Sequence, residues 1–111
     1  SLSDNKGNLR SYASATYVEK AHSKGLKVWA LVNDFGTQDK ASKEYTKKVL
    51  TDTTKRENLV DNIMTNIKDY NLDGINIDFE FINKDIINSY LQFLRELSIE
   101  CRSLWLQITL L

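Results

Sequence analysis

The chain has 111 residues, of which 41% are hydrophobic and 27% are charged. These proportions predict one folded domain with a packed core and exclude a largely disordered chain. The 15 basic residues balance the 15 acidic residues, so we expect neither nucleic acid nor an anionic membrane as the main partner, because both favour a basic excess.

The first half of the chain predicts two helices around one strand. Residues 1–10 are polar and predict a loop, and apolar residues at helical spacing follow over residues 11–24. Gly25 lies where a helix often ends. Residues 26–32 are almost continuously apolar, which is typical of a strand buried on both faces of a parallel sheet. Residues 40–50 predict a short exposed helix.

The second half continues the alternation of helix and strand. A helix is predicted from Thr54, where a capping box begins, to Asn71, a residue type that often ends helices. Residues 73–80 and 104–110 predict two further strands, and an amphipathic helix over residues 87–101 lies between them. Strands joined by helices indicate parallel pairing with right-handed crossovers.

Three parallel strands with amphipathic helices between them predict an α/β fold, either a doubly wound sheet or part of a (β/α)8 barrel. No glycine-rich phosphate loop follows a predicted strand, so a nucleotide-binding doubly wound fold is unsupported. A complete barrel needs about 250 residues, and the last predicted strand reaches the end of the chain. We therefore expect residues 1–111 to be a fragment of a single barrel domain.

The predicted strand over residues 73–80 combines apolar and polar side chains in alternation. Because side chains on a strand point alternately to its two faces, Asn76, Asp78 and Glu80 share one face. The apolar residues between them suit packing against helices. Burying an amide and two carboxylates is costly unless they are hydrogen-bonded and used. Asp73 has the opposite parity, so we expect it at the entrance of the strand.

The two acidic residues at the end of this strand suggest acid–base chemistry. Glu80 lies at the C-terminal end, where α/β barrels place catalytic groups. The Cα atoms of Asp78 and Glu80 are about 6.5 Å apart in a strand. Two carboxylates this close in a secluded site favour protonation of one of them, which a general acid requires. Because both point the same way, Asp78 is badly placed as an opposing nucleophile, which would come from elsewhere, for example the substrate.

The segment LDGINIDFE resembles the D-G-x-D-x-D-x-E signature of glycoside hydrolase family 18, the chitinase family. The resemblance implies a (β/α)8 barrel with the signature on its fourth strand, and substrate-assisted cleavage next to an N-acetylated sugar. It implies that Glu80 is the general acid/base, that Asp78 orients the N-acetyl group, and that Asp73 is a structural aspartate. Asn76 stands in place of the family's middle aspartate. In this substitution the sequence resembles the subgroup of spore-cortex-lytic enzymes, which cleave peptidoglycan.

The resemblance also implies a substrate, a location and further site residues. We expect the parent protein to hydrolyse β-1,4 bonds of chitin or peptidoglycan with retention, without a cofactor or a metal, in a secreted, cell-surface or spore-associated setting. Asn76 is expected to tune Asp78 by hydrogen bonding, and Asn33 to contact the sugar. Side-chain alternation along the last predicted strand lets Gln107 face the barrel interior, so Gln107 is also expected to contact the sugar. The chain alone is expected to be almost inactive, because half of the sugar site has no counterpart, and to self-associate through open barrel edges.

Two other classes of function stay open. A non-catalytic carbohydrate-binding or scaffold protein on the same fold is disfavoured by Glu80, because relatives that only bind often lose that residue. A metal-dependent α/β enzyme would use the oxygen-bearing side chains of residues 73–80 as ligands for Mg²⁺ or Ca²⁺, but Asp73 has the wrong parity. Three other candidates are interpreted as structural: His22 on a helix face, and Trp29 and Cys101 in the core.

Other features of the sequence narrow the class of protein. The single cysteine excludes an internal disulfide and a cysteine-based zinc site. No apolar run is long enough to span a bilayer, and no leading segment has the charged start and apolar middle of a signal peptide. We therefore expect no membrane partner.

Overall fold

The computed structural model describes residues 1–35, 40–103 and 107–110, with the backbone alone for residues 40–42 and 107–110. The chain is an α/β structure of alternating helices and strands, which confirms the α/β part of the predicted fold class. In chain order the elements are α1 (Ala15–Ser23), β1 (Trp29–Asn33), α2 (Lys40–Leu50), α3 (Thr53–Tyr70), β2 (Gly74–Asp78), the short 3-10 helix η1 (Lys84–Ile86), α4 (Ile87–Ser103) and β3 (Gln107–Leu110).

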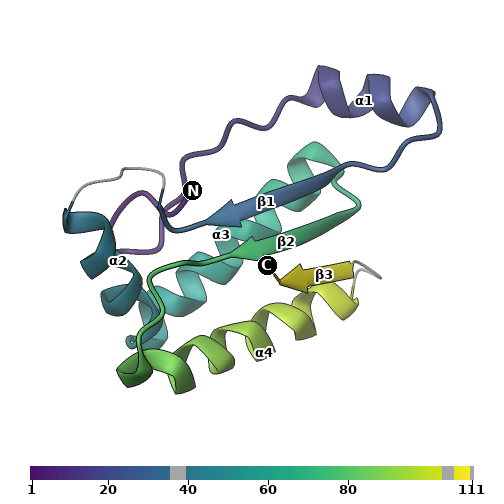
Figure 1. Cartoon of the computed structure of the whole chain (residues 1–111). Helices are drawn as coiled ribbons and strands as arrows, with labels where there is room; N and C mark the ends of the chain where they lie inside the picture. The colour runs from purple at the N-terminus through teal and green to yellow at the C-terminus, as the bar shows by residue number, and fades with distance from the viewer. Residues whose placement is uncertain (36–39, 104–106, 111) are drawn as a thin grey trace.

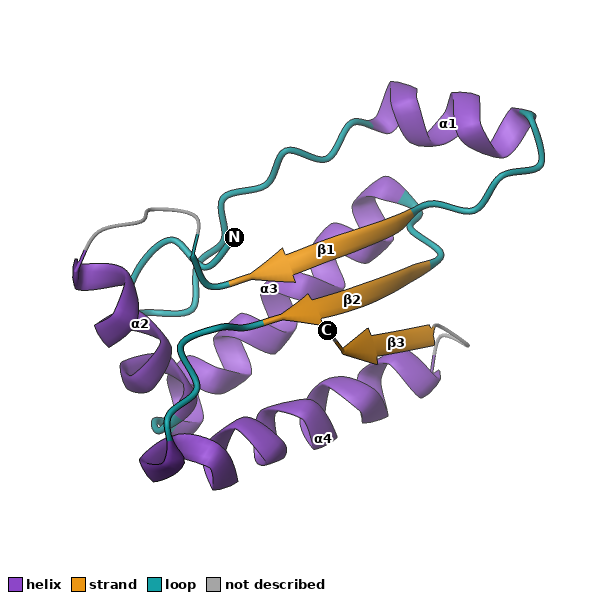
Figure 2. Cartoon of the chain, in the orientation of Figure 1, coloured by secondary structure: helices purple, strands orange, loops and turns teal. Residues whose placement is uncertain are grey.

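The described strands form a parallel sheet in the order β1-β2-β3, and their arrows point the same way in Figure 2. In the β1–β2 pair, Leu31 lies opposite Asn76 and Asn33 lies opposite Asp78. Part of the strand predicted over residues 104–110 lies outside the described residues, which give β3 as Gln107–Leu110.

Helices α3 and α4 run along one face of this sheet (Figure 1). The β2 side chains Ile75 and Ile77 are fully buried there. The opposite face is open at Leu31, which is 51% exposed, and at Trp29. The expectation that residues 26–32 are buried on both faces is therefore wrong, as is the expected core position of Trp29, because the helices α3 and α4 cover the other side of β1 and β2.

The start of β1 also differs from the prediction. Gly25 adopts a positive φ of 75°, and its N–H donates to the carbonyl of His22 at 2.9 Å, so the predicted end of the first helix is confirmed. The N–H of Leu26 donates to the carbonyl of Ala21 at 3.0 Å. Leu26 thus belongs to the turn that ends α1, and the strand begins at Trp29 rather than at residue 26.

The ends of α3 follow local capping rules. The N-cap is Asp52, whose carboxylate accepts a hydrogen bond from the N–H of Lys55 at 3.0 Å. The capping box predicted at Thr54 is therefore wrong, because the aspartate before it takes the cap position. Asn71 ends the helix in the left-handed conformation, as predicted. None of the described helices combines the length and the apolar character needed to cross a membrane.

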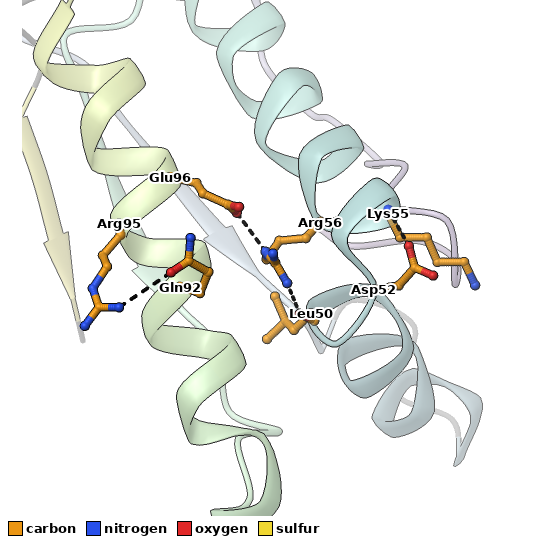
Figure 3. Close-up of polar contacts among 7 residues, drawn as sticks. All are labelled: Leu50, Asp52, Lys55, Arg56, Gln92, Arg95 and Glu96. Atoms are coloured by element: carbon orange, nitrogen blue, oxygen red, sulfur yellow. Dashed lines mark hydrogen bonds and ion pairs between the residues drawn. The ribbon is translucent and has the colours of Figure 1, made fainter.

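A buried arginine joins three helices on the far side from the open sheet face (Figure 3). Arg56 of α3 is 8% exposed. Its Nε donates to Glu96 of α4 at 2.8 Å, and its Nη1 donates to the carbonyl of Leu50, the last residue of α2, at 2.9 Å. Because both contacts use a buried side chain, Arg56 fixes the spacing of the helix layer that supports the sheet.

The N-terminal loop docks on α3 and on the end of β1. Gly7 has a positive φ of 92°, and a Cβ at this position would lie 2.6 Å from the carbonyl oxygen of Lys55, so no larger residue is accommodated without a shift. The N–H of Leu2 donates to the carbonyl of Asn33 at 2.9 Å. The loop therefore lies against the C-terminal end of β1, where Asn33 is followed by Asp34.

Candidate active site

Burial along β2 alternates as a strand with one covered face requires. Ile75 and Ile77 are fully buried and Phe79 is 9% exposed. Asn76 and Asp78 are partly exposed, and Glu80 is exposed. Because neighbours in sequence point to opposite faces, the amide and the carboxylate of β2 lie on the face away from the helices, and the same alternation continues to Glu80.

Asp34, which the sequence analysis did not select, organises the C-terminal ends of β1 and β2. It follows β1 directly and is 1% exposed. Its Oδ1 accepts a hydrogen bond from the N–H of Glu80 at 2.8 Å, and its Oδ2 accepts from the N–H of Phe81 at 3.1 Å and from the Thr46 hydroxyl at 2.9 Å. The one available signal was its place after a parallel strand, where α/β proteins collect functional groups.

These contacts explain why β2 is shorter than the predicted strand over residues 73–80. The last paired residues are Asn33 and Asp78. Beyond them, the backbone N–H groups of Glu80 and Phe81 donate to a side chain instead of to a neighbouring strand. Glu80 therefore lies just past β2, at its C-terminal end, in a segment held by a carboxylate.

Aromatic packing holds the residue between the two acids. The Phe79 ring lies 5.5 Å from the ring of Phe93 and 6.1 Å from the ring of Tyr90, measured between centroids, and both partners belong to α4. Burial raises the pKa of the Tyr90 hydroxyl, and the carboxylates of Asp34 and Asp78 raise it further. The peptide between Asp78 and Glu80 is thus anchored in the core by Phe79.

Two amides lie beside Asp78 on the open face. Asn33 is its partner in the β1–β2 register, and the Asn33 Oδ1 accepts from the N–H of Phe35 at 3.3 Å. The Oδ1 of Asn76 is buried and has no hydrogen-bond partner among the described residues. An unpaired buried acceptor is costly, about 1–3 kcal/mol, so the described residues leave one unfavourable polar atom on this face.

Asp73 lies at the other end of the sheet, at the strand entrance that its parity predicts. Its Oδ2 accepts from the N–H of Val28 at 2.7 Å and lies 2.7 Å from the Nε2 of His22. The Val28 N–H, and then the His22 side chain, hold the pKa of Asp73 below its usual range. Because Asp73 is roughly 16 Å along the chain from Asp78, the structure does not bring it together with Asp78 and Glu80.

The predicted substrate contact Gln107 is described by its backbone alone. Its Cα is the partner of Gly74 in the β2–β3 register, which is roughly 13 Å along the strand from Asp78. The assignment of Gln107 as a sugar contact stays a prediction. Among the described residues, no three His, Cys, Asp or Glu side chains gather as ligands for a metal ion.

Comparison with known proteins gives both a family and a fold. A model of the family described as glycosyl hydrolases family 18 matches residues 1–110. Similar solved structures include a protein named as a sporulation-specific glycosylase of Bacillus subtilis, with 23% identity and a TM-score of 0.86. They also include the spore cortex-lytic enzyme SleL of Bacillus megaterium QM B1551 (18%, 0.84) and a class V chitinase of Pseudomonas fluorescens Pf-5 (20%, 0.83).

Each of these three alignments covers 96% of this chain but 35%, 25% and 33% of the respective solved chains. The chain therefore spans a quarter to about a third of these structures, and at such low identity the likeness shows a shared fold. A search of the curated proteins gives no match.

Proposed function

Because this chain belongs to family 18 of the glycosyl hydrolases, we propose that residues 1–111 form part of a (β/α)8 barrel that hydrolyses a glycan. The parallel pairing of β1 with β2 and the helices on one face support this architecture. In a closed barrel, the open face with Leu31 and Asp78 would line the interior, and the exposed apolar area of Leu31 would be covered.

The proposed substrate is a polymer that contains N-acetylglucosamine, either chitin or peptidoglycan, cleaved at β-1,4 bonds with retention. Two of the similar structures are named as a spore cortex-lytic enzyme and a chitinase. Residues 73–80 retain the acidic residues of the chitinase signature except at Asn76. This substitution favours peptidoglycan.

In the proposed first step, Glu80 in its protonated form gives a proton to the leaving glycosidic oxygen. The oxygen of the substrate's own N-acetyl group bonds to the anomeric carbon as the glycosidic bond breaks, while Asp78 orients that group and stabilises its developing positive charge. In the second step, water attacks the anomeric carbon, the bond to the N-acetyl oxygen breaks, and Glu80 takes the proton from water. Two displacements on opposite faces give retention, and Glu80 returns to its starting state.

The neighbouring residues take supporting roles in this proposal. Asn76 tunes Asp78 by hydrogen bonding, which the shared face of the two side chains on β2 supports. Asn33, the register partner of Asp78, contacts the sugar. Asp73 is a structural residue at the strand entrance, and Gln107 is a further sugar contact.

One observation carries the proposal. The alternation of burial along β2 directs Asp78 to the open face and leaves Glu80 exposed at the C-terminal end of the strand. A carboxyl group at that position can reach a substrate, whereas one buried against α3 or α4 could not.

The test compares the complete barrel protein with its Glu80→Gln variant on N-acetylglucosamine oligosaccharides and on cortex peptidoglycan. Loss of general acid–base catalysis is expected to lower kcat by about 10²–10⁴-fold. The matched control is Glu19→Gln, which changes an exposed glutamate of α1 in the same way. Equal activity of the wild type and Glu80→Gln would remove Glu80 from the mechanism and overturn the proposed function.

We also propose that the 111-residue chain alone self-associates. β1 is an edge strand of the described sheet, and Leu31 exposes an apolar side chain on the open face. Exposed edges and apolar faces favour pairing between copies. Analytical ultracentrifugation is expected to show dimers or larger species, and a clean monomer at all concentrations would contradict this.

A further inference from the structure

Asp34 is the most completely buried carboxylate among the described residues, and its contacts converge on the segment that holds Glu80. It is 1% exposed, and Thr46, which donates to it from α2, is 0% exposed. Its two oxygens accept from the backbone N–H groups of two consecutive residues, Glu80 and Phe81. A side chain from the end of β1 thus fixes the backbone that follows β2.

The geometry of this contact restrains orientation as well as position. One hydrogen bond to a backbone N–H would let the peptide rotate about that bond. Two bonds, at 2.8 Å to Glu80 and 3.1 Å to Phe81, define the directions of two successive peptide planes. The Cα–Cβ bond of Glu80 then points in a fixed direction, and its carboxyl group moves through its own side-chain torsions alone.

Burying Asp34 is costly, so its hydrogen bonds must offset the cost. Transferring a carboxylate from water to the protein interior is unfavourable unless it is paired or hydrogen-bonded. Three donors offset this cost, namely the backbone N–H groups of Glu80 and Phe81 and the Thr46 hydroxyl. The buried carboxylate therefore holds the backbone beside the exposed acid Glu80 in one arrangement.

We propose that Asp34 is a positioning residue for catalysis, which holds the Glu80 backbone so that the Glu80 carboxyl group meets the leaving glycosidic oxygen. This inference rests on the proposed function of Glu80. Asp34 itself touches no reacting atom. Its role is to limit the region of space that the general acid samples, and a misplacement of about 1 Å can cost about 10²-fold in rate.

The test uses the complete barrel protein and two substrates that differ in their need for an acid. An N-acetylglucosamine tetrasaccharide has a sugar leaving group, whose oxygen must be protonated as the bond breaks. The dinitrophenyl β-glycoside of N,N′-diacetylchitobiose has a leaving group that departs as an anion without protonation. For each substrate, kcat/KM reports the steps up to the first bond cleavage, so the ratio of the two values isolates the contribution of the acid.

For Asp34→Ala, we expect kcat/KM on the tetrasaccharide to fall by about 10–100-fold, while the value on the dinitrophenyl glycoside falls by less than about threefold. Asp34→Asn keeps one acceptor for the Glu80 N–H and is expected to lie between the wild type and Asp34→Ala. Should Asp34→Ala fail to fold, the ratio measured for Asp34→Asn decides the question.

Two further variants separate the possible failures. Arg56→Met removes buried contacts within the helix layer, away from Asp78 and Glu80. This variant shows how general destabilisation changes kcat/KM for both substrates. If the Asp34 variants lower both values by a common factor, as expected for Arg56→Met, Asp34 is merely structural and the inference is overturned. If Glu80→Gln does not lower tetrasaccharide cleavage, the proposed function itself fails. If Glu80→Gln lowers it and the Asp34 variants leave the ratio unchanged, the inference alone fails.

Discussion

Two aspartates fasten the same pair of strands at opposite ends. At the C-terminal end, Asp34 follows β1 and accepts from the N–H groups of Glu80 and Phe81. At the N-terminal end, Asp73 precedes β2 and accepts from the N–H of Val28. Each carboxylate thus crosses from one strand to the backbone of the other, beyond the last paired residues.

The two aspartates differ in burial and in the side chain that each contacts in addition to the backbone. Asp34 is buried with the neutral hydroxyl of Thr46. The Asp73 side chain is 31% exposed and contacts the partly exposed imidazole of His22. The same kind of contact, from a backbone N–H to an aspartate carboxylate, thus has a different role at each end of the strands. The partly exposed pair of Asp73 and His22, at the N-terminal end of the strands, joins α1 to the sheet. The buried pair of Asp34 and Thr46, at the C-terminal end, holds the backbone at Glu80.

An activity assay of the 111-residue chain alone tests whether the C-terminal end of these strands is sufficient for catalysis, and the expected loss of activity is complete. We expect the 111-residue chain alone to give no detectable turnover of chitooligosaccharide or of cortex peptidoglycan, because half of the proposed sugar site has no counterpart in it. The complete barrel protein serves as the positive control in the same assay. Measurable turnover by the chain alone would show that Asp78 and Glu80 act without the rest of a barrel.

A smaller effect compares the two aspartates in stability. Asp34→Ala leaves three donors without their acceptor and is expected to lower the free energy of unfolding by about 3 kcal/mol, whereas Asp73→Ala is expected to cost about 1 kcal/mol because water reaches its partners. Chemical denaturation of both variants, at one fixed chain concentration, measures these costs. Equal losses of stability in the two variants would show that the difference in burial does not distinguish the two aspartates.

A still smaller effect is expected in the pH dependence of the stability that Asp73 contributes. The pKa of Asp73 is lowered in the folded chain by the Val28 N–H and then by His22. Its stabilisation is therefore present above the unfolded pKa and is lost as the pH falls through the lowered folded pKa. The stability difference between the wild type and Asp73→Asn, measured by denaturation, is expected to shrink between about pH 5 and pH 2. A difference that stays constant over this range would contradict the assigned contacts.

Local patterns in the sequence predicted much of this structure. Helical periodicity predicted α3 and α4, and Asn71 and Gly25 predicted helix ends. Strand alternation predicted the partition of β2 into a covered apolar face and an open polar face. These features follow from the chain's own period and from backbone preferences at single residues, so they require no knowledge of distant neighbours.

The end of β2 could not be predicted in this way. The pattern favoured a strand as far as Glu80, but the partner strand ends at Asn33, and Asp34 replaces it as the acceptor. The exposure of Trp29 was also misjudged, because an apolar residue on a strand does not reveal which face the helices cover.

Local patterns were enough to predict the order of helices and strands, the parallel pairing, and the placement of Asp78 on the face of β2 opposite its apolar residues. The contacts of Asp34 and Asp73, which join the two strands at opposite ends, became visible only in the folded chain. The physical reason is that a hydrogen bond between residues 46 positions apart depends on the register in which two strands meet, and no local spacing encodes that register.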